Sequence, residues 1–472
     1  MKKILMLLML LPAWSVMADN VTEKRARQCA AEFLFPASQS RAGNGAQLLD
    51  MVYSGSDSRK SRSVGSEPPF YVFNVRDGQG FVIIAGDDAV MPVLGYSMTN
   101  TFRGDSLPPN LEGWMDGYAR QIDAVRMQGL KATPEVATAW QNVSLSRASG
   151  ADGIYMETAE WNQDYPYNMQ CPVVGKNWLG VKIRAVTGCV ATAMAIVMRY
   201  HCWPASPTKE IPPYTTSNGV NVSQRVKTSY NWGNMPMSWM KFRSKSAKNQ
   251  VSGLIADCGA AAQLEYGKEA TSGYMHKARN AMVDYMNYSA ESSYARRSSY
   301  TDEEWNNKLR TSLHNFGPVL YRGAKNDGTG GHMFVIDGYK DNKYHINWGW
   351  GNISNGYFAL DAMKPTIVWI PQGEYSDGQA AILNLRPKSK EIVNPLKDIS
   401  FSYDVMAKKV TFEGVQEKHQ VKFTGPLGIN LSHRIDRLKN RLTVDVKWLI
   451  KGEYKFSFTL DGQSKTLILK LQ

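Results

Sequence analysis

Apolar positions follow two different periods in the first third of the chain. Over residues 21–34 and 110–128 they recur every three or four positions, which is typical of helices that bury one face. Between these stretches, short apolar runs at 70–75, 80–86 and 92–97 are bounded by Gly, Asp and Pro, which is typical of strands and turns. This first unit is therefore predicted to be α+β.

From Val393 onward the pattern changes to short runs in which apolar and polar residues alternate. Such runs are typical of half-buried strands, and the pair Asp461-Gly462 between the last two runs is a hairpin signal. We therefore predict that residues 391–472 form a small β-sandwich, an accessory or sorting domain. The runs that support this prediction are 442–446, 454–458 and 466–471.

Residues 130–153 separate the first unit, residues 19–129, from the middle of the chain, residues 154–388. The segment mixes Pro, Ala, Ser and Gly without a period. Segments of this kind are exposed and are preferred sites of proteolysis. We therefore expect an activation linker here, with cleavage at Arg147 preferred and any position from Lys131 to Asp152 open.

Residues 1–18 have the organisation of a secretory signal peptide. Lys2 and Lys3 precede an apolar run over residues 4–11, and Ala18 supplies the small residue expected before a cleavage point. The run is far shorter than the roughly 20 residues that span a bilayer. We therefore expect a protein that a bacterium secretes or holds at its surface, without a membrane span.

Composition excludes one class of partner and raises one chemical question. The chain has 55 Lys and Arg against 42 Asp and Glu, a net charge of +13, but the basic clusters at 241–245 and 386–390 come without a nucleic-acid recognition motif. These clusters are interpreted as solvated loops, and no nucleic-acid partner is expected. The five cysteines are odd in number and irregularly spaced, which leaves at least one thiol unpaired.

Cys189 has the setting of a reactive thiol. It follows Gly188, which allows a sharp turn, and it opens an apolar run that continues to Tyr200 before Pro204 blocks the helix. By itself such a cysteine is more often an inert buried residue. At a helix N-terminus, however, the free N–H groups and the dipole favour the thiolate, so the pKa of the thiol is expected to fall.

His332 and Asn347 are the partners that a thiol nucleophile needs. His332 follows two glycines and opens an alternating run, and after a turn at 340–343 a second run ends at Asn347. In a hairpin the start of one strand lies near the end of the other, so Asn347 is expected close to His332. Its oxygen would accept the imidazole N–H and orient the ring, and Trp348 would shield that bond from water.

Three blocks of the chain together resemble the streptopain-type cysteine peptidases of the papain superfamily. These blocks are 187–193, 330–339 and 347–351. Residues 161–172 also resemble the start of the mature enzyme in this family, and residues 71–97 resemble its propeptide. The resemblance covers roughly residues 20–388 and implies a papain-like fold preceded by an α+β propeptide.

The resemblance implies a role for particular residues. Cys189 would be the nucleophile and His332 the general base and acid, while Asn347 and Trp348 would support the histidine. It also implies that the enzyme requires a reduced thiol and needs no metal or organic cofactor. The residues it leads us to expect at the substrate-binding cleft are Thr271, Ser272, Gly273, Gly330 and Gly331.

One part of the chain departs from the papain pattern. Papain-like enzymes place a Gln several residues before the nucleophile as a donor to the oxyanion, but residues 182–186 here read Lys-Ile-Arg-Ala-Val. The backbone N–H of Cys189 remains as one donor. Arg184 is a candidate for the second.

The sequence therefore predicts a secreted cysteine endopeptidase made as a zymogen, with protein or peptide substrates and its own propeptide as an intramolecular inhibitor. Two alternatives stay open. The same Cys and His would serve another acyl transfer, such as transglutamination. The altered residues before Cys189 are also compatible with a secreted, non-catalytic protein that binds peptides or a surface.

Overall fold

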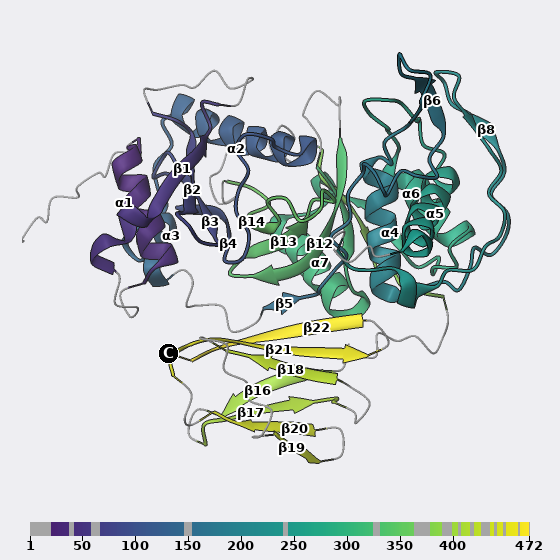
Figure 1. Ribbon diagram of the computed structural model, residues 1–472. Coiled ribbons are helices and arrows are strands. Elements are labelled where there is room, and N and C mark those ends of the chain that lie inside the picture. The colour runs from purple at the N-terminus through teal and green to yellow at the C-terminus, as the bar shows by residue number, and fades with distance from the viewer. Residues whose placement is uncertain are drawn as a thin grey trace, which may run out of the picture.

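The computed structural model describes most of the chain (Figure 1). Among the residues it describes, no helix is both long enough and apolar enough to cross a membrane. The predicted signal peptide lies outside them. The described residues are 20–36, 42–57, 67–145, 153–238, 244–323, 331–362, 378–388, 399–404, 407–415, 420–425, 435–438, 441–446, 450–460 and 463–471.

The N-terminal unit is α+β, as its apolar pattern predicts. Four antiparallel strands follow one another in the order β1-β2-β3-β4, and every residue of β3 and β4 is buried. One long helix, α2, lies against the sheet of the middle unit. The elements are α1 (Glu23–Leu34), η1 (Ala42–Leu48), β1 (Leu49–Ser54), β2 (Phe70–Val75), β3 (Phe81–Ala85), β4 (Val93–Ser97) and α2 (Pro109–Met127).

The segment expected to be an unpatterned linker is partly folded, which corrects that expectation. It contains the helix α3 (Pro134–Gln141) and the short turn η2 (Val143–Leu145). Val136 and Trp140 lie one helical turn apart and are buried, and the Trp140 Nε1–H donates to the carbonyl of Val90 at 2.8 Å. Two apolar residues at this spacing suffice to dock a capped helix, although they are too few to show a period. Arg147 lies outside the described residues.

A helical lobe carries Cys189, the candidate nucleophile. Its central helix, α4, has twelve of its thirteen residues buried, because α5 and α6 pack on one side and β12 on another. The elements of this lobe are β6 (Val173–Lys176), β7 (Lys182–Arg184), α4 (Cys189–His201), β8 (Tyr214–Thr215), β9 (Asn221–Val222), η3 (Trp232–Asn234), α5 (Lys245–Ala261) and α6 (Met275–Asp284).

An antiparallel sheet flanked by α7 forms the second lobe. Along β12, Met333 and Val335 belong to the core around α4, whereas Phe334 and Ile336 belong to the core shared with the N-terminal unit. This alternation places β12 between the two. The elements are β10 (Ser293–Arg296), η5 (Arg297–Ser299), α7 (Asp302–Phe316), β11 (Val319–Gly323), β12 (His332–Lys340), β13 (Lys343–Asn347), β14 (Gly356–Phe358) and β15 (Ala380–Leu383).

One sheet continues through all three parts of the chain. On one side β4 of the N-terminal unit pairs with β14, so that Tyr96 lies opposite Tyr357. On the other side β5 (Ile154–Tyr155) pairs with both β12 and β22 of the C-terminal part. Strands of two or three residues are too short to show a period, so the sequence did not predict these connections.

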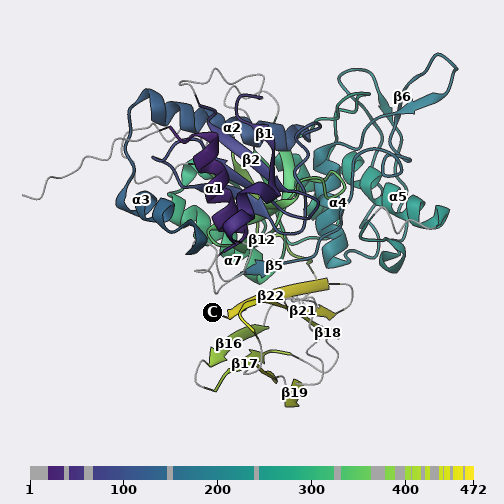
Figure 2. The same ribbon diagram turned by 60° about the vertical axis from the view of Figure 1, so that its left-hand side comes forward.

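The C-terminal part is a pair of facing sheets, the sandwich that its alternating pattern predicts (Figures 1 and 2). Side chains of both sheets share one core, in which the rings of Phe412 and Phe456 lie 4.7 Å apart. Lys340 of the middle unit forms an ion pair with Glu453 on this part. One sheet contains β16 (Ser400–Asp404), β17 (Lys409–Glu413), β19 (Ile435–Leu438) and β20 (Arg441–Asp445), and the other contains β18 (Gln420–Thr424), β21 (Gly452–Leu460) and β22 (Gln463–Leu471).

Candidate active site

Gly188 determines where the helix of the nucleophile begins. Its φ of +82° lies in the left-handed region, and a Cβ at this position would stand 2.8 Å from Cγ2 of Thr271 and 3.0 Å from its carbonyl oxygen. Glycine alone therefore fits without strain. The turn that it makes allows Cys189 to be the first residue of α4, as the sequence predicts.

Cys189 as a residue is partly exposed, and its thiol lies among backbone donors. The N–H of Met333 donates to its Sγ across 3.4 Å. Desolvation by the surrounding protein raises the pKa of the thiol, and the N–H groups of Met333, Val190 and Cys189 itself act against that rise. The expected fall in pKa is therefore wrong for this form of the chain, because burial outweighs the helix N-terminus.

Strand β12 brings His332 to the nucleophile. His332 is its first residue and pairs with Gly323 of β11, and the next residue, Met333, is the one that donates to Cys189. His332 itself is partly exposed. The contact of Met333 with Cys189 thus places the residue after His332 at the thiol, and the pairing of His332 with Cys189 stays a prediction.

Three hydrogen bonds hold the side chain of Asn347 at the end of β13. Its Nδ2 donates to Oγ1 of Thr158 at 2.9 Å and to the carbonyl of Ala159 at 3.0 Å, and its Oδ1 accepts from the N–H of Gly349 at 3.0 Å. The strand register places Asn347 opposite Val335, three residues along β12 from His332. The amide is held in one orientation, and its role toward His332 stays a prediction.

Trp348 is fully buried beside Asn347. Its ring lies 4.9 Å from that of Phe334 and 5.1 Å from that of Phe358, and its Nε1–H donates to the carbonyl of Ser354 at 3.2 Å. The shielding of Asn347 from water by this ring stays a prediction.

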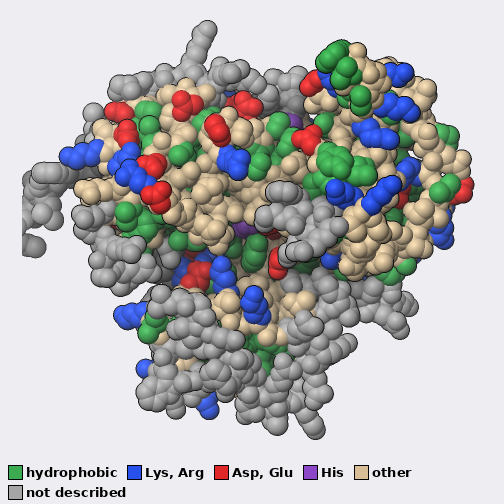
Figure 3. Space-filling view, in the orientation of Figure 1, with side chains coloured by type: hydrophobic (Ala, Val, Ile, Leu, Met, Phe, Trp, Pro, Cys, Tyr) green, Lys and Arg blue, Asp and Glu red, His purple; other side chains and the backbone are tan. Residues whose placement is uncertain are grey.

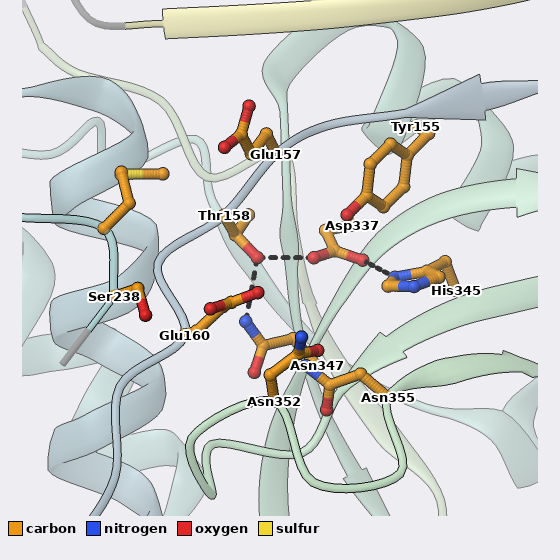
Figure 4. Close-up of a pocket in the computed structure, with 11 residues that line it drawn as sticks. Tyr155, Glu157, Thr158, Glu160, Ser238, Asp337, His345, Asn347, Asn352 and Asn355 are labelled. Atoms are coloured by element: carbon orange, nitrogen blue, oxygen red, sulfur yellow. Dashed lines mark hydrogen bonds and ion pairs between the residues drawn. The ribbon is translucent and has the colours of Figure 1, made fainter. Parts of the chain in front are cut away.

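Asn347 is the first member of a chain of hydrogen-bonded, buried polar side chains (Figure 4). The sequence did not predict this chain. Thr158 accepts from Asn347 and donates to Asp337, and Asp337 also binds Nδ1 of His345 at 2.5 Å. Because the hydroxyl proton of Thr158 is committed to Asp337, its oxygen is left to accept from Asn347, which fixes how the amide is turned. These side chains line a cavity of about 240 Å³.

The residues expected to bind substrate fall into two groups. Thr271 contacts the glycine that precedes the nucleophile, and Ser272 and Gly273 continue the same segment. Gly331 is exposed next to His332. Gly330 lies outside the described residues.

Gln163 is a functional candidate that sequence reasoning missed. Its carbonyl accepts from the N–H of Thr187 at 3.1 Å, which ties it to the turn leading into Cys189. Gln163 is 4% exposed, and its Nε2 is buried with no hydrogen-bond partner among the described residues. Buried donors without a partner are rare and call for an explanation. A donor reserved for an oxyanion is such an explanation.

Arg184, the expected second oxyanion donor, is directed elsewhere. Its Nη1 donates to the carbonyl of Cys171 at 2.6 Å, and the residue is exposed and lines a separate pocket. The hairpin of β6 and β7 carries Arg184 into this position. The expectation that it serves the oxyanion is therefore not met.

The N-terminal unit contacts the residues around the nucleophile. Helix α2 lies against β11 and β12, and Nδ2 of Asn110 in its first turn donates to the carbonyl of Trp348 at 2.7 Å. The ring of Trp114, one turn further on, makes edge contacts with Phe334 at 5.6 Å and Trp348 at 6.1 Å. The unit is thus wedged against the strands that carry His332 and Asn347.

Within the described ranges, no three His, Cys, Asp or Glu side chains gather into a group that would hold a metal ion. All five cysteines are free. Cys29, Cys171 and Cys258 are buried, and burial raises the pKa of each thiol, that of Cys171 to about 12. None of these three stands at the start of a helix, where Cys189 does.

Two family models match the chain. Residues 161–358 match the Peptidase C10 family, and residues 18–122 match the Spi protease inhibitor family. The first match contains Cys189, His332 and Asn347, and the second covers most of the N-terminal unit.

Named relatives agree with these matches. The chain is 31% identical over 399 residues to the thiol protease/hemagglutinin PrtT of Porphyromonas gingivalis, covering 82% of this chain and 44% of that protein. It is 30% identical over 382 residues to streptopain of Streptococcus pyogenes, covering 77% of this chain and 92% of streptopain. A solved fragment of Prevotella intermedia prointerpain A superposes with a TM-score of 0.53 at 25% identity, covering 70% of this chain and 99% of the fragment.

Proposed function

The chain belongs to the Peptidase C10 family of cysteine peptidases, and from that premise we propose that it is a secreted zymogen that hydrolyses peptide bonds through Cys189 and His332. The observation that carries the assignment of the pair is the contact between Sγ of Cys189 and the N–H of Met333, the residue after His332. Packing of β12 on α4 brings the start of this strand to the first residue of the helix.

In the proposed reaction, His332 takes the proton of Cys189 and the thiolate attacks the carbonyl carbon of the scissile peptide bond. The tetrahedral intermediate collapses as His332 gives its proton to the leaving amine, which leaves an acyl-enzyme. Water, deprotonated by His332, then attacks the thioester and releases the acid and the thiol. The chemistry requires a reduced thiol and, in our proposal, no metal or organic cofactor.

Two donors are proposed for the oxyanion of the intermediate. One is the backbone N–H of Cys189 at the start of α4, and the other is Nε2 of Gln163, a buried donor without a partner among the described residues. Donors fixed in advance are most effective at this task, because they need no rearrangement as charge develops. Asn347 is proposed to orient the imidazole of His332, with Trp348 excluding water.

The N-terminal unit is proposed to inhibit the enzyme until the chain is cut. It extends the catalytic sheet through the pairing of β4 with β14, and Trp114 packs on the face of β12 that Phe334 presents, two residues after His332. The raised pKa of Cys189 in this form fits a dormant thiol, because the protonated sulfur is a poor nucleophile. We place the cleavage after α3 and before β5, which is a narrower range than the linker of residues 130–153 that the sequence predicts.

A time course of processing tests this proposal. The precursor of the wild type, incubated with dithiothreitol, should lose the segment before β5 and gain activity on a fluorogenic peptide in the same period. Cys189→Ala precursor should persist unless another protease is added. A wild-type protein that reaches full activity while residues 20–129 remain covalently attached would refute the zymogen model.

A further inference from the structure

The hairpin of β6 and β7 exposes a cluster of large apolar side chains. Trp178 is 91% exposed, Leu179 64% and Val181 58%. Figure 2 shows this hairpin projecting from the helical lobe, and in Figure 3 the same region presents hydrophobic side chains beside basic ones. Exposed apolar groups that gather at one place mark interaction sites more often than single ones do.

The tip of the hairpin is held in shape by its own hydrogen bonds. The N–H of Asn177 donates to the carbonyl of Val181 at 2.9 Å, and Oδ1 of Asn177 accepts from the N–H of Leu179 at 3.0 Å and from that of Val181 at 2.9 Å. Gly180 supplies the left-handed residue that the turn needs, with φ of +77°. A partner would therefore meet a preformed surface, which reduces the entropy lost on binding.

A pocket of about 640 Å³ opens at the base of the hairpin. Valines, polar side chains of Gln, Asn and Ser, Tyr266 and two arginines line it, and no Asp or Glu is among the described residues of its wall. Asp257 neutralises Arg225 through an ion pair of 2.5 Å, whereas Arg184 donates to the carbonyl oxygen of Cys171 and forms no ion pair with a described residue. Lys176 and Lys182 lie opposite each other across the two strands of the hairpin. The pocket and the hairpin therefore favour an acidic ligand.

The wall of this pocket continues toward the nucleophile. Tyr266 belongs to a loop closed by the pairing of Glu265 with Ser272. Thr271, the residue before Ser272, contacts Gly188. Arg184 of this pocket precedes Cys189 by five residues, so a polypeptide held at Cys189 would need only a short extension to reach the pocket and the hairpin.

We propose that this hairpin and pocket form an exosite for polypeptide substrates, a surface that binds residues of the substrate away from the scissile bond. An apolar substrate side chain would pack on Trp178 and Leu179, and an acidic one would pair with Arg184. The inference rests on the proposed peptidase function and adds a preference for acidic and apolar flanking residues.

Geometry favours a substrate over a separate partner. The exposed tip is far smaller than the roughly 1,200–2,000 Å² that a stable protein–protein interface buries. A chain already held in the cleft needs much less, because the second contact forms at high effective concentration.

Three fluorogenic peptides with the same residues around the cleaved bond test the exosite. One is short, and two are extended on the amino or the carboxyl side by a flexible stretch that ends in a Leu- and Glu-containing segment. Activated wild type, Trp178→Ser, Arg184→Gln and the control Ile450→Ser, which changes a half-exposed apolar residue in the C-terminal part, are compared by kcat/KM.

We expect the wild type to prefer one extended peptide over the short one, and Trp178→Ser to lower kcat/KM for it by about tenfold through KM. Arg184→Gln should act in the same direction. Its effect should vanish when the Glu of the extension is replaced by Gln. The short peptide should be cleaved equally by all four proteins.

Equal kcat/KM for all peptides on active wild type overturns the exosite and leaves the proposed peptidase activity intact. Loss of binding to phosphatidylglycerol vesicles by Trp178→Ser, with peptide cleavage unchanged, would overturn it in favour of a membrane contact. A wild type that cleaves no peptide refutes the proposed function itself.

Discussion

Replacing Trp114 by alanine should open the precursor around its nucleophile. Trp114 is 7% exposed, and its ring meets those of Phe334, Trp348 and Tyr321, all in the middle unit, at 5.6, 6.1 and 6.4 Å. Among the described residues of its own unit, the ring of Tyr118 lies as near, at 6.4 Å. Three of these four ring contacts, which the substitution removes, therefore join the N-terminal unit to the middle unit.

The size of the effect follows from the burial of this ring. Truncating a buried Trp to Ala costs about 3–5 kcal/mol. If about 2–4 kcal/mol of that loss falls on the contact between the two units, the population in which the N-terminal unit has swung away rises roughly 30- to 1000-fold. Reagents that need access to the thiol should then react faster by a similar factor, as long as the open state stays a minor one.

The assay is alkylation of Cys189 by iodoacetamide in uncut precursor, read by peptide mass spectrometry. A His332→Ala background removes self-processing and keeps the thiol. Trp140→Ala is the matched control, because that ring is buried within the N-terminal unit and its Nε1–H donates to Val90. The reasoning fails if Trp114→Ala labels within about threefold of its parent, or if Trp140→Ala accelerates labelling as much.

Three further predictions concern the catalytic groups. Gln163→Ala should lower kcat by about 10²–10³ with a small change in KM and an unchanged circular dichroism spectrum, because it removes one oxyanion donor; a kcat within threefold of wild type would return Gln163 to a structural role. Asn347→Ala should lower kcat less than His332→Ala does, because the asparagine only orients the ring that moves the proton, a step typically contributing about 10²–10⁴-fold; the reverse order in folded proteins would contradict the roles. In the precursor, burial raises the pKa of Cys189 and so disfavours its thiolate. The alkylation rate of the precursor should therefore keep rising with pH above neutrality, whereas that of the activated enzyme should reach its plateau at lower pH. Identical pH profiles for the two forms would contradict this account.

The elements that the sequence predicts well are those with a long apolar period or a strong turn signal. The helix from Cys189 and the hairpin that starts at His332 are both found with nearly the predicted bounds, because their side chains are almost all buried. The helix over residues 134–141 was missed, since only two of its residues are buried and a single apolar pair shows no period.

The parts of the site that were missed depend on contacts between distant segments. Gln163 follows Trp161 in a block that the sequence marks only by resemblance, and its lack of a partner becomes visible only when the chain is folded. The same holds for Thr158, which orients Asn347 from a strand-like segment far away in the sequence. The pKa of Cys189 was expected to fall because the helix N-terminus is readable from sequence, whereas the desolvation that raises it is not.

Labelling by an epoxysuccinyl thiol inhibitor tests the central claim most directly. Activated enzyme is titrated with the inhibitor, residual activity on a fluorogenic peptide is followed, and the modified cysteine is identified by peptide mass spectrometry. The account predicts that activity falls in proportion to label, reaches zero at one equivalent, and that the label is on Cys189. Full modification of Cys189 with activity retained, or loss of activity through label on Cys202, the other partly exposed cysteine, would contradict it.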